Sequence, residues 1–307
     1  MTTYILRRVV QAIPVLIGIT LFTFLMIHLV PGDPVSIIAG DKPITEERAA
    51  QIRSQYGLDK PLWRQYTDYM ADLSRGDMGA GLHSKRPVTD SLREAAWPTI
   101  QLTIAGLVVA ITLGISLGIL AALFHNTLID SIAMVIALIG VSMPIFYLGL
   151  LLLFALSFNI HLFPATGTGG IKHLVLPAIA VGFASSAYIA RLVRSSMLEV
   201  LRQDYVVTAR AKGLHDRIVI TRHALKNALI PVVTFLGIQT AGLLTGAVVT
   251  ETVFSRPGLG GVAIRAINAR DFPLIQGTVL VAAVTYVLVN LIVDLSYAVF
   301  DPRIRYG

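Results

Sequence analysis

Six apolar runs alternate with polar segments along the 307-residue chain. Each run approaches or exceeds the length that a helix needs to cross a bilayer, about 20 residues. The pattern therefore predicts an all-α polytopic membrane protein with six transmembrane helices. The first run is longer than the apolar region of a signal peptide, about 7–15 residues, so we expect an uncleaved first helix. The runs cover residues 9–30, 99–124, 132–158, 174–190, 229–249 and 274–300.

The polar segment 31–98 is expected to contain two helices. Thr45 can cap the first of these, and Gly57 can end it. The second should begin at Pro61 and stop at Gly76, with apolar side chains at helical spacing along one face. That face needs a surface to bury against, which favours a small helical extracytoplasmic insertion over a solvated linker. The residues of this face are Leu62, Trp63, Tyr66, Met70 and Leu73.

Basic residues are distributed unevenly between the two sides of this arrangement. With the N-terminus in the cytoplasm, twelve Lys and Arg residues fall in the N-terminal tail, the segment 191–226 and the C-terminal tail. The two short outer loops contain four. Cytoplasmic loops of membrane proteins carry an excess of Lys and Arg, so both termini are expected in the cytoplasm.

Composition excludes several classes of function. Mean hydropathy is +0.72 and only 14% of residues are charged, against about 25% in soluble domains. The net charge of +7 comes from residues that flank apolar spans and forms no basic stripe with aromatics, so nucleic-acid binding is not expected. Without cysteine there are no disulfides or thiolate metal sites.

Catalytic motifs are also missing from the sequence. It has no G-x-x-x-x-G-K-[ST] phosphate loop, no G-x-S-x-G and no H-E-x-x-H. Its seven histidines are scattered, and none is expected to pair closely with a carboxylate. We expect a non-catalytic chain that binds no metal.

Small residues and one proline interrupt the apolar runs. Gly114 with Gly118, and Gly242 with Gly246, would let helix backbones approach closely, as ordinary packing or as a moving contact. Pro144 should bend the third span, and a static kink is favoured over a lining for a transport route.

Two acidic residues lie in or beside the spans. Asp294 is near the cytoplasmic end of the last span, where a structural role is favoured over ion coupling. Glu251, at the outer end of the fifth span, is expected to reach water.

The polar, basic segment 199–231 separates the fourth and fifth spans. We expect helix to continue from the fourth span through Tyr205 to Lys212 and to stop at Gly213, which adopts a left-handed conformation cheaply. Asp216 should cap a second helix, and Pro231 should begin the fifth span. A basic amphipathic pair of this kind can rest on anionic lipid or contact a soluble protein. The apolar face of the second helix comprises Ile218, Leu225, Ala228 and Leu229.

Within this segment, ARAKGLHDRIVITRHALKNALIP is similar to the cytoplasmic signature of binding-protein-dependent ABC importer permeases, in their peptide and nickel branch. The resemblance covers the whole chain. Val207-Thr208-Ala209 stands where the general signature has Glu-Ala-Ala, which removes any role for that glutamate. Other matching stretches are LVPGDP (29–34), YGLDKPLWRQY (56–66), GDMG (76–79), SMLEVLRQDYVVTARAKG (196–213), TETVFSRPGLG (250–260), RDFPLIQG (270–277) and the terminal VDLSYAVFDPRIR.

The resemblance implies a type I ABC importer permease fold. It implies that the turn around Gly213 is a coupling helix, seated in a groove of a separate ATPase. The chain itself would bind no cofactor, whereas the ATPases would use ATP and Mg. Closure of the ATPases would drive alternating access. The implied coupling residues are Ala209, Arg210, Ala211, Lys212, Gly213, Leu214, His215, Asp216 and Arg217, and the candidate gating residues are Met143, Pro144 and Phe146.

The implied assembly contains a second homologous permease, two cytoplasmic ATP-binding subunits and an extracytoplasmic substrate-binding protein, in the bacterial inner membrane. Residues 1–30 would form the N-terminal tail and first helix, 31–98 the extracytoplasmic segment and 99–307 the core permease. The expected function is import of di- or oligopeptides. Glutathione or nickel chelates are the alternative cargo, and an ion-coupled secondary transporter using Asp294 or a non-transporting receptor are the alternative classes.

Overall fold

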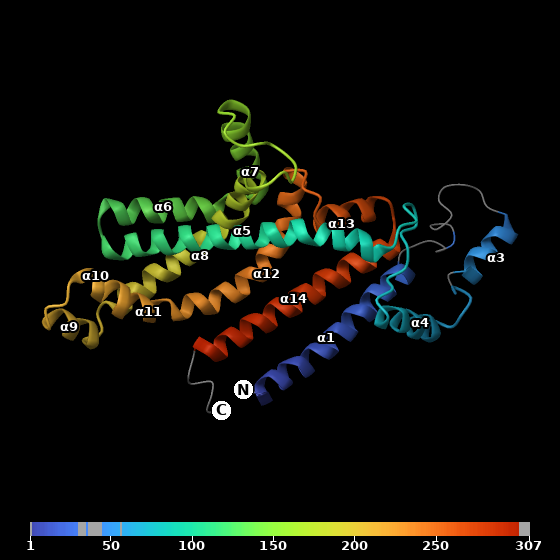
Figure 1. Cartoon of the computed structure of the whole chain (residues 1–307), viewed down its shortest axis with the longest axis horizontal. Helices are drawn as coiled ribbons and strands as arrows, with labels where there is room; N and C mark the ends of the chain where they lie inside the picture. Colours follow the sequence, from blue (N-terminus) through green and yellow to red (C-terminus); the bar gives the residue numbers. More distant parts are fainter. Residues whose placement is uncertain (1, 30–34, 36–44, 56, 301–307) are drawn as a thin grey trace. The chain divides into compact units, whose positions relative to one another are not determined.

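A computed structural model describes residues 2–29, 35, 45–55 and 57–300, and its regular structure within these ranges is helical. The chain divides into two compact units. Among the described residues, one comprises Pro98–Gly260 and 288–300, and the other comprises Thr2–Trp97 and Gly261–Val287. The long helices are α1 (Thr2–Leu29), α5 (Val88–Leu123), α8 (Ile171–Val200), α12 (Ile230–Val253) and α14 (Phe272–Phe300) (Figure 1).

Four helices, α1, α5, α8 and α14, are individually long and apolar enough to cross a membrane. Two bent helix pairs raise the number of candidate spans in the described residues to as many as six. These helices confirm the prediction of an all-α polytopic membrane protein.

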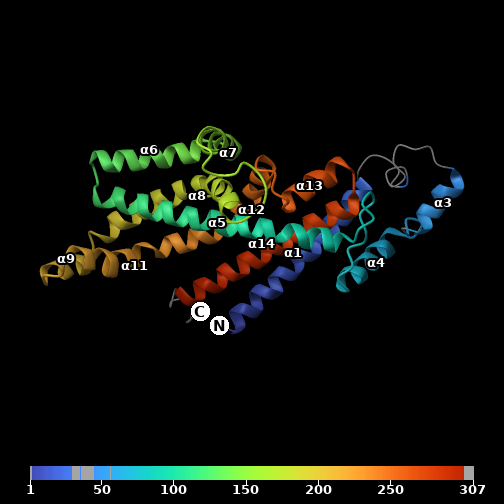
Figure 2. The ribbon, with the colours of Figure 1, turned by 45° about the horizontal axis from the view of Figure 1, so that its top comes forward.

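The third apolar run bends at Pro144, as the sequence predicted, and the bend is a complete break in the helix. It forms α6 (Leu128–Ser142), then α7 (Ile145–Leu152) and the π-helix η1 (Leu153–Asn159), and the two halves meet at 109°. Met143 ends α6 in an extended conformation and Pro144 precedes α7. Proline disfavours a helical conformation at the residue before it, which explains the break. Figures 1 and 2 show α7 turning away from α6 at this point.

The first unit is organised around α8, which contacts α6, α7, α11 (Leu225–Ala228) and α12. In the most apolar stretch of α8, 61% of the residues are buried, against 17–28% in the corresponding stretches of α1, α5 and α14. The predicted close approach at Gly114 and Gly118 is confirmed against α8. A Cβ at Gly114 would lie 2.6 Å from the Cβ of Ile189, and one at Gly118 would lie 2.6 Å from the carbonyl oxygen of Ala190.

The same prediction fails at Gly242. Among the described residues, a Cβ there would meet only the side chain of Gln239 in its own helix, at 3.9 Å. The surroundings of Gly246 lie outside the part of the chain that the structure describes. Of the two predicted pairs, Gly114 with Gly118 is the one for which the described residues show close helix packing.

In the second unit, the short helix α4 (Leu62–Ser74) packs on α1. The Tyr66 hydroxyl lies 3.0 Å from Thr20 Oγ1, and the rings of Tyr66 and Tyr69 lie 5.4 and 6.2 Å from the ring of Phe24. The predicted apolar face is thus only partly buried, because Leu62 and Trp63 at its first turn remain exposed.

The predicted ends of the short helices are confirmed. Gly57 follows α3 (Glu46–Gln55) with φ +64°, and Gly76 follows α4 with φ +81°. Thr45 Oγ1 accepts a hydrogen bond from the Arg48 amide at 3.4 Å, as expected of an N-cap. A further helix, α13 (Leu259–Asn268), was not expected from the sequence.

Candidate functional site

The segment 199–231 folds as a helical hairpin. Helix α9 (Asp204–Ala211) is followed by a turn at Gly213, the short α10 (Asp216–Ile218), the π-helix η2 (Val219–Ala224) and α11. The continuous helix expected from α8 is interrupted, because residues 201–203 form a turn before α9. α9 is therefore a separate helix whose direction is not fixed by α8.

Gly213 ends α9 as predicted, with φ +79°. Its amide donates to Arg210 O at 2.9 Å, and the Leu214 amide donates to Ala209 O at 3.4 Å. This pair of bonds is the Schellman arrangement, which satisfies the last carbonyl groups of a helix and requires a left-handed residue. The turn has a defined backbone conformation that most other residues would strain.

The second helix of the hairpin is capped by His215, not by Asp216 as the sequence suggested. His215 Nδ1 accepts a hydrogen bond from the Arg217 amide at 3.2 Å. Asp216 lies in the first turn, where its charge suits the positive helix end. Its carboxylate also lies 3.3 Å from Arg210 Nε, which links the two arms across the turn.

A small apolar cluster holds the hairpin together. Val206, Ala209 and Val219 are buried, with Val200 and Leu201 packed against them. Of the nine residues assigned to the turn, Ala209 is buried and the other eight are exposed. Ala209 thus has a structural position, whereas the other eight are available to a partner.

The π-helix η2 sets which side of the second arm is buried. Val219 and Ala224, five residues apart, are both buried, and Ala228 follows four residues later. Because a π turn places residues five apart on one face, the buried face includes Val219 and leaves Ile218 exposed. The predicted position of Ile218 on this face is therefore wrong. Leu225 and Leu229 pack on the α8 core as expected.

Two kinds of side chain share the exposed surface of the hairpin. Arg210, Lys212 and Arg217 carry positive charge, and Leu214 and Ile218 are apolar and 38% and 43% exposed. Charged and apolar groups in one small area can bind a complementary protein surface or anionic lipid. Within the described residues, no group of three or more His, Cys, Asp or Glu could hold a metal ion.

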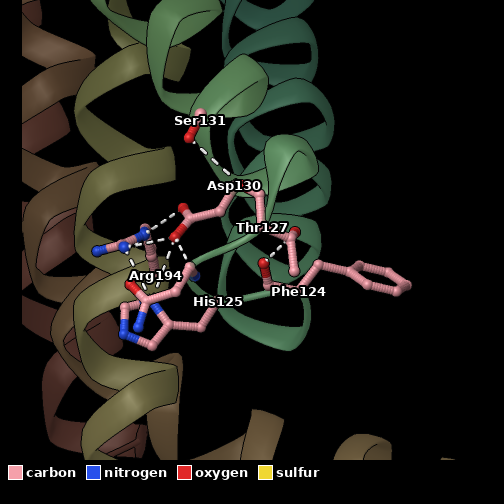
Figure 3. A network of polar contacts seen from close by, with 7 residues as sticks. Phe124, His125, Thr127, Asp130, Ser131 and Arg194 are labelled. Atoms are coloured by element: carbon pink, nitrogen blue, oxygen red, sulfur yellow. Dashed lines mark hydrogen bonds and ion pairs between the residues drawn. The ribbon is translucent and has the colours of Figure 1, made fainter.

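A polar network missed in the sequence joins the turn between α5 and α6 to α8 (Figure 3). Arg194 donates from Nε and one terminal nitrogen to the two oxygens of Asp130, both at 2.7 Å. Asp130 also accepts from the Asn126 amide at 3.1 Å and lies in the first turn of α6. The pair is a two-point bridge between α6 and α8 on the hairpin side of the unit.

His125 belongs to the same network, so the expectation that no histidine lies close to a carboxylate is wrong. Its Nδ1 is 3.2 Å from Asp130 Oδ2 and 3.0 Å from a terminal nitrogen of Arg194. A guanidinium only donates and a carboxylate only accepts, so Nδ1 can bond to Arg194 or to Asp130 but not to both in one tautomer. The short spacing of His125 and Asp130 could have indicated from the sequence that they lie close together. Arg194, 64 residues beyond Asp130, could not have been identified as their partner in this way.

Glu251 is 1% exposed, contrary to the expectation that it reaches water. It accepts hydrogen bonds from the Thr99 hydroxyl and, at 2.9 Å, from the Gly260 amide. The Leu259 amide donates to Thr99 Oγ1 at 2.9 Å. Leu259 and Gly260 open α13, so Glu251 and Thr99 satisfy a helix N-terminus. The burial of Glu251 is therefore explained by α13, whose first amide groups need an acceptor.

The candidate gating residues lie at the break between α6 and α7. Met143 is half-buried, and Pro144 and Phe146 are exposed. Gly149, one turn into α7, packs closely on Phe254, where a Cβ would lie 3.1 Å from the ring. Asp294 lies in α14, but its side chain is outside the described residues.

These helices define an integral membrane protein of the multi-span helical class. Residues 114–306 match the family described as binding-protein-dependent transport system inner membrane component, and residues 1–100 match the N-terminal family of the same systems. The chain belongs to this family of transport permeases. The resemblance found in its motifs is thereby confirmed.

Curated relatives match over the whole chain. A dipeptide transport system permease protein, DppB, of Alkalihalophilus pseudofirmus is 44% identical and covers 100% of both chains. DppB of Escherichia coli K12 is 43% identical over 100% of this chain and 99% of its own. The glutathione transport system permease protein GsiC of Escherichia coli K12 is 40% identical over 100% of both.

Solved structures share the fold at lower identity. An inward-facing crystal form of the MetNI methionine ABC transporter has a TM-score of 0.57 at 19% identity. The match covers 69% of this chain and 96% of that one. An amino acid ABC transporter has a TM-score of 0.51 at 17% identity, over 70% of this chain and 94% of the other. They confirm the predicted ABC importer permease fold.

Proposed function

We propose that this chain is the membrane-spanning subunit of an ATP-driven importer of di- or oligopeptides in the bacterial inner membrane. Relatives of 43–44% identity over the full length are named as dipeptide permeases, and this supports the cargo class. A relative of 40% identity is named for glutathione, itself a small peptide derivative. Glutathione and nickel chelates are the alternative cargoes.

The partners follow from the family and from what the chain does not contain. Without a phosphate loop it cannot build the usual nucleotide site of a P-loop ATPase, so two separate subunits would hydrolyse ATP with Mg. A second homologous permease would complete the pathway, and an extracytoplasmic binding protein would deliver the cargo. The chain would be a non-catalytic subunit without a cofactor, with both termini in the cytoplasm.

The observation that carries the mechanism is the exposed, conformationally fixed turn around Gly213. A segment that transmits a push must be rigid in itself and anchored to what it moves. The Schellman bonds, the His215 cap and the Val206 cluster supply the rigidity. The anchor is the packing of η2 and α11 on α8. The exposed residues 210–217 would contact the ATPase.

The break at Met143 and Pro144 would then be a point where α6 and α7 move separately. Phe146, exposed at the start of α7, would be a gating residue in this mechanism. The helix break and the exposure of Pro144 and Phe146 support a gating role for this region.

Proteoliposomes containing the chain and its partner subunits test the coupling assignment. Arg217→Glu should reduce ATP-driven uptake by more than tenfold, because like charges across an interface cost several kcal/mol and about 1.4 kcal/mol is tenfold. Arg222→Glu is the matched control, since Arg222 is also exposed but lies beyond the turn. Equal uptake in both variants would refute the assignment.

Backbone substitutions at Gly213 give a second, independent test. Nothing lies within 4 Å of a Cβ built there, so only the left-handed backbone opposes a side chain. Gly213→Asn should retain uptake, because Asn tolerates this conformation, and Gly213→Val should lose it. The proposed cargo is tested by competition with unlabelled di- and oligopeptides, glutathione and nickel chelates. Uptake that persists without ATP but collapses with the ion gradient would favour a secondary transporter.

A further inference from the structure

Helix α4 has an apolar edge that the rest of its unit does not cover. Tyr66 and Tyr69 pack on α1, yet Leu62 is 52% exposed and Trp63 is 65% exposed. An exposed tryptophan beside an exposed leucine on a strongly amphipathic helix marks an interaction surface. The question is what covers it.

The contacts of α4 with α1 set its depth. Thr20 and Phe24, which touch the tyrosines, lie inside the candidate membrane span Leu6–Met26. They come six and two residues before its end. At 1.5 Å per residue, the contacts are about 9 and 3 Å before Met26, and the apolar run continues to Val30, so both contacts lie on the apolar part of α1. If α1 crosses a membrane, α4 cannot stand clear of the bilayer surface.

The two edges of α4 differ in chemistry. With 3.6 residues per turn, Asp72 lies about 180° around the helix from Trp63. On the Asp72 side, α4 borders a cavity of about 670 Å³ that is also lined by Lys60, Asp68 and Arg75. One edge is therefore suited to lipid and the opposite edge to water.

We propose that α4 lies in the membrane interface, with Trp63 among the outermost acyl carbons and the Asp72 edge in water. Tryptophan is enriched at this level because its ring is apolar and its N–H is polar. The Arg64 guanidinium lies 5.9 Å from the centre of the Trp63 ring, so a cation is placed where headgroup phosphates would be. The proposal requires that α1 spans the membrane. It does not depend on which cargo is transported.

Spin labels can measure the depth of the two edges, because the chain has no cysteine. The full-length chain would be reconstituted in lipid nanodiscs with a single label at Trp63→Cys or, as the matched control, at Asp72→Cys. Oxygen concentrates in the bilayer and a nickel chelate stays in water. We expect the ratio of oxygen to nickel collision rates to be several-fold higher at position 63 than at position 72.

Two results would overturn the proposal. Equally low ratios at both positions would place α4 in water. A label at position 63 that neither reagent reaches would show that protein covers this edge. A third label at Ile17→Cys, exposed in the middle of α1, checks the span itself. A high oxygen ratio at 17 with a low ratio at 63 would reject the interfacial position of α4 and leave the span intact.

Tryptophan fluorescence tests the same surface without altering it. The chain has two tryptophans, so Trp97→Phe leaves Trp63 as its only one. Lipids brominated near the top of the acyl chains should quench Trp63, and aqueous iodide should quench it weakly. Strong iodide quenching without bromolipid quenching would contradict the proposal.

Discussion

The ion pair between Asp130 and Arg194 gives the sharpest energetic prediction. Asp130→Asn removes the charge and keeps an acceptor for the Asn126 amide, and Arg194→Gln removes the other partner. The Asp130 side chain is 7% exposed and that of Arg194 27%, so the pair lies between a buried and a surface ion pair. Breaking a buried pair costs about 3–5 kcal/mol and a surface pair about 0–1. We expect a coupling energy of about 2 kcal/mol between these limits.

A double-mutant cycle isolates this coupling energy from the other effects of each substitution. The two single variants and the double variant would be reconstituted in nanodiscs, and their unfolding free energies compared. The pair Lys60–Asp68 is a surface control at 2.7 Å with both side chains about half exposed, and its variants should behave like the wild type. A coupling energy below about 0.5 kcal/mol would refute the bridge between α6 and α8.

Three further substitutions test packing and hydrogen bonding. Gly114→Leu should cost at least about 1–3 kcal/mol in thermal unfolding, because even a Cβ would lie 2.6 Å from that of Ile189. Gly258→Ala should destabilise the chain by a similar amount, because its Cβ would overlap the Glu251 carboxylate, and Gly258→Ser should be no better. Tyr205→Phe, which loses an exposed 2.8 Å hydrogen bond from α11, should cost at most about 1 kcal/mol and leave membrane insertion unchanged.

The long helices and their ends were predictable because their causes are local. An apolar run of sufficient length specifies a membrane helix whatever surrounds it. Glycine at a helix end specifies a left-handed stop, as found at Gly57, Gly76 and Gly213. In each case the residue itself carries the information.

The polar sites were not predictable because each depends on residues far apart in the sequence. Asp130 meets Arg194 only after α6 packs on α8, and Glu251 meets Thr99 only after α12 lies beside α5. Sequence position near the end of a span suggested access to water for Glu251. Glu251 is buried instead, because it accepts a hydrogen bond from the N-terminus of α13.

The π-helix η2 shows how a one-residue difference changes the proposed function of the hairpin. With regular α-helical spacing, Ile218 would share the buried face with Leu225 and Leu229, as the sequence predicted. The five-residue step from Val219 to Ala224 moves the buried face by one position and leaves Ile218 exposed. The exposed surface is therefore less purely basic than the sequence indicated. Apolar groups beside Arg217 add a second kind of contact to the basic ones, and a protein interface uses both kinds.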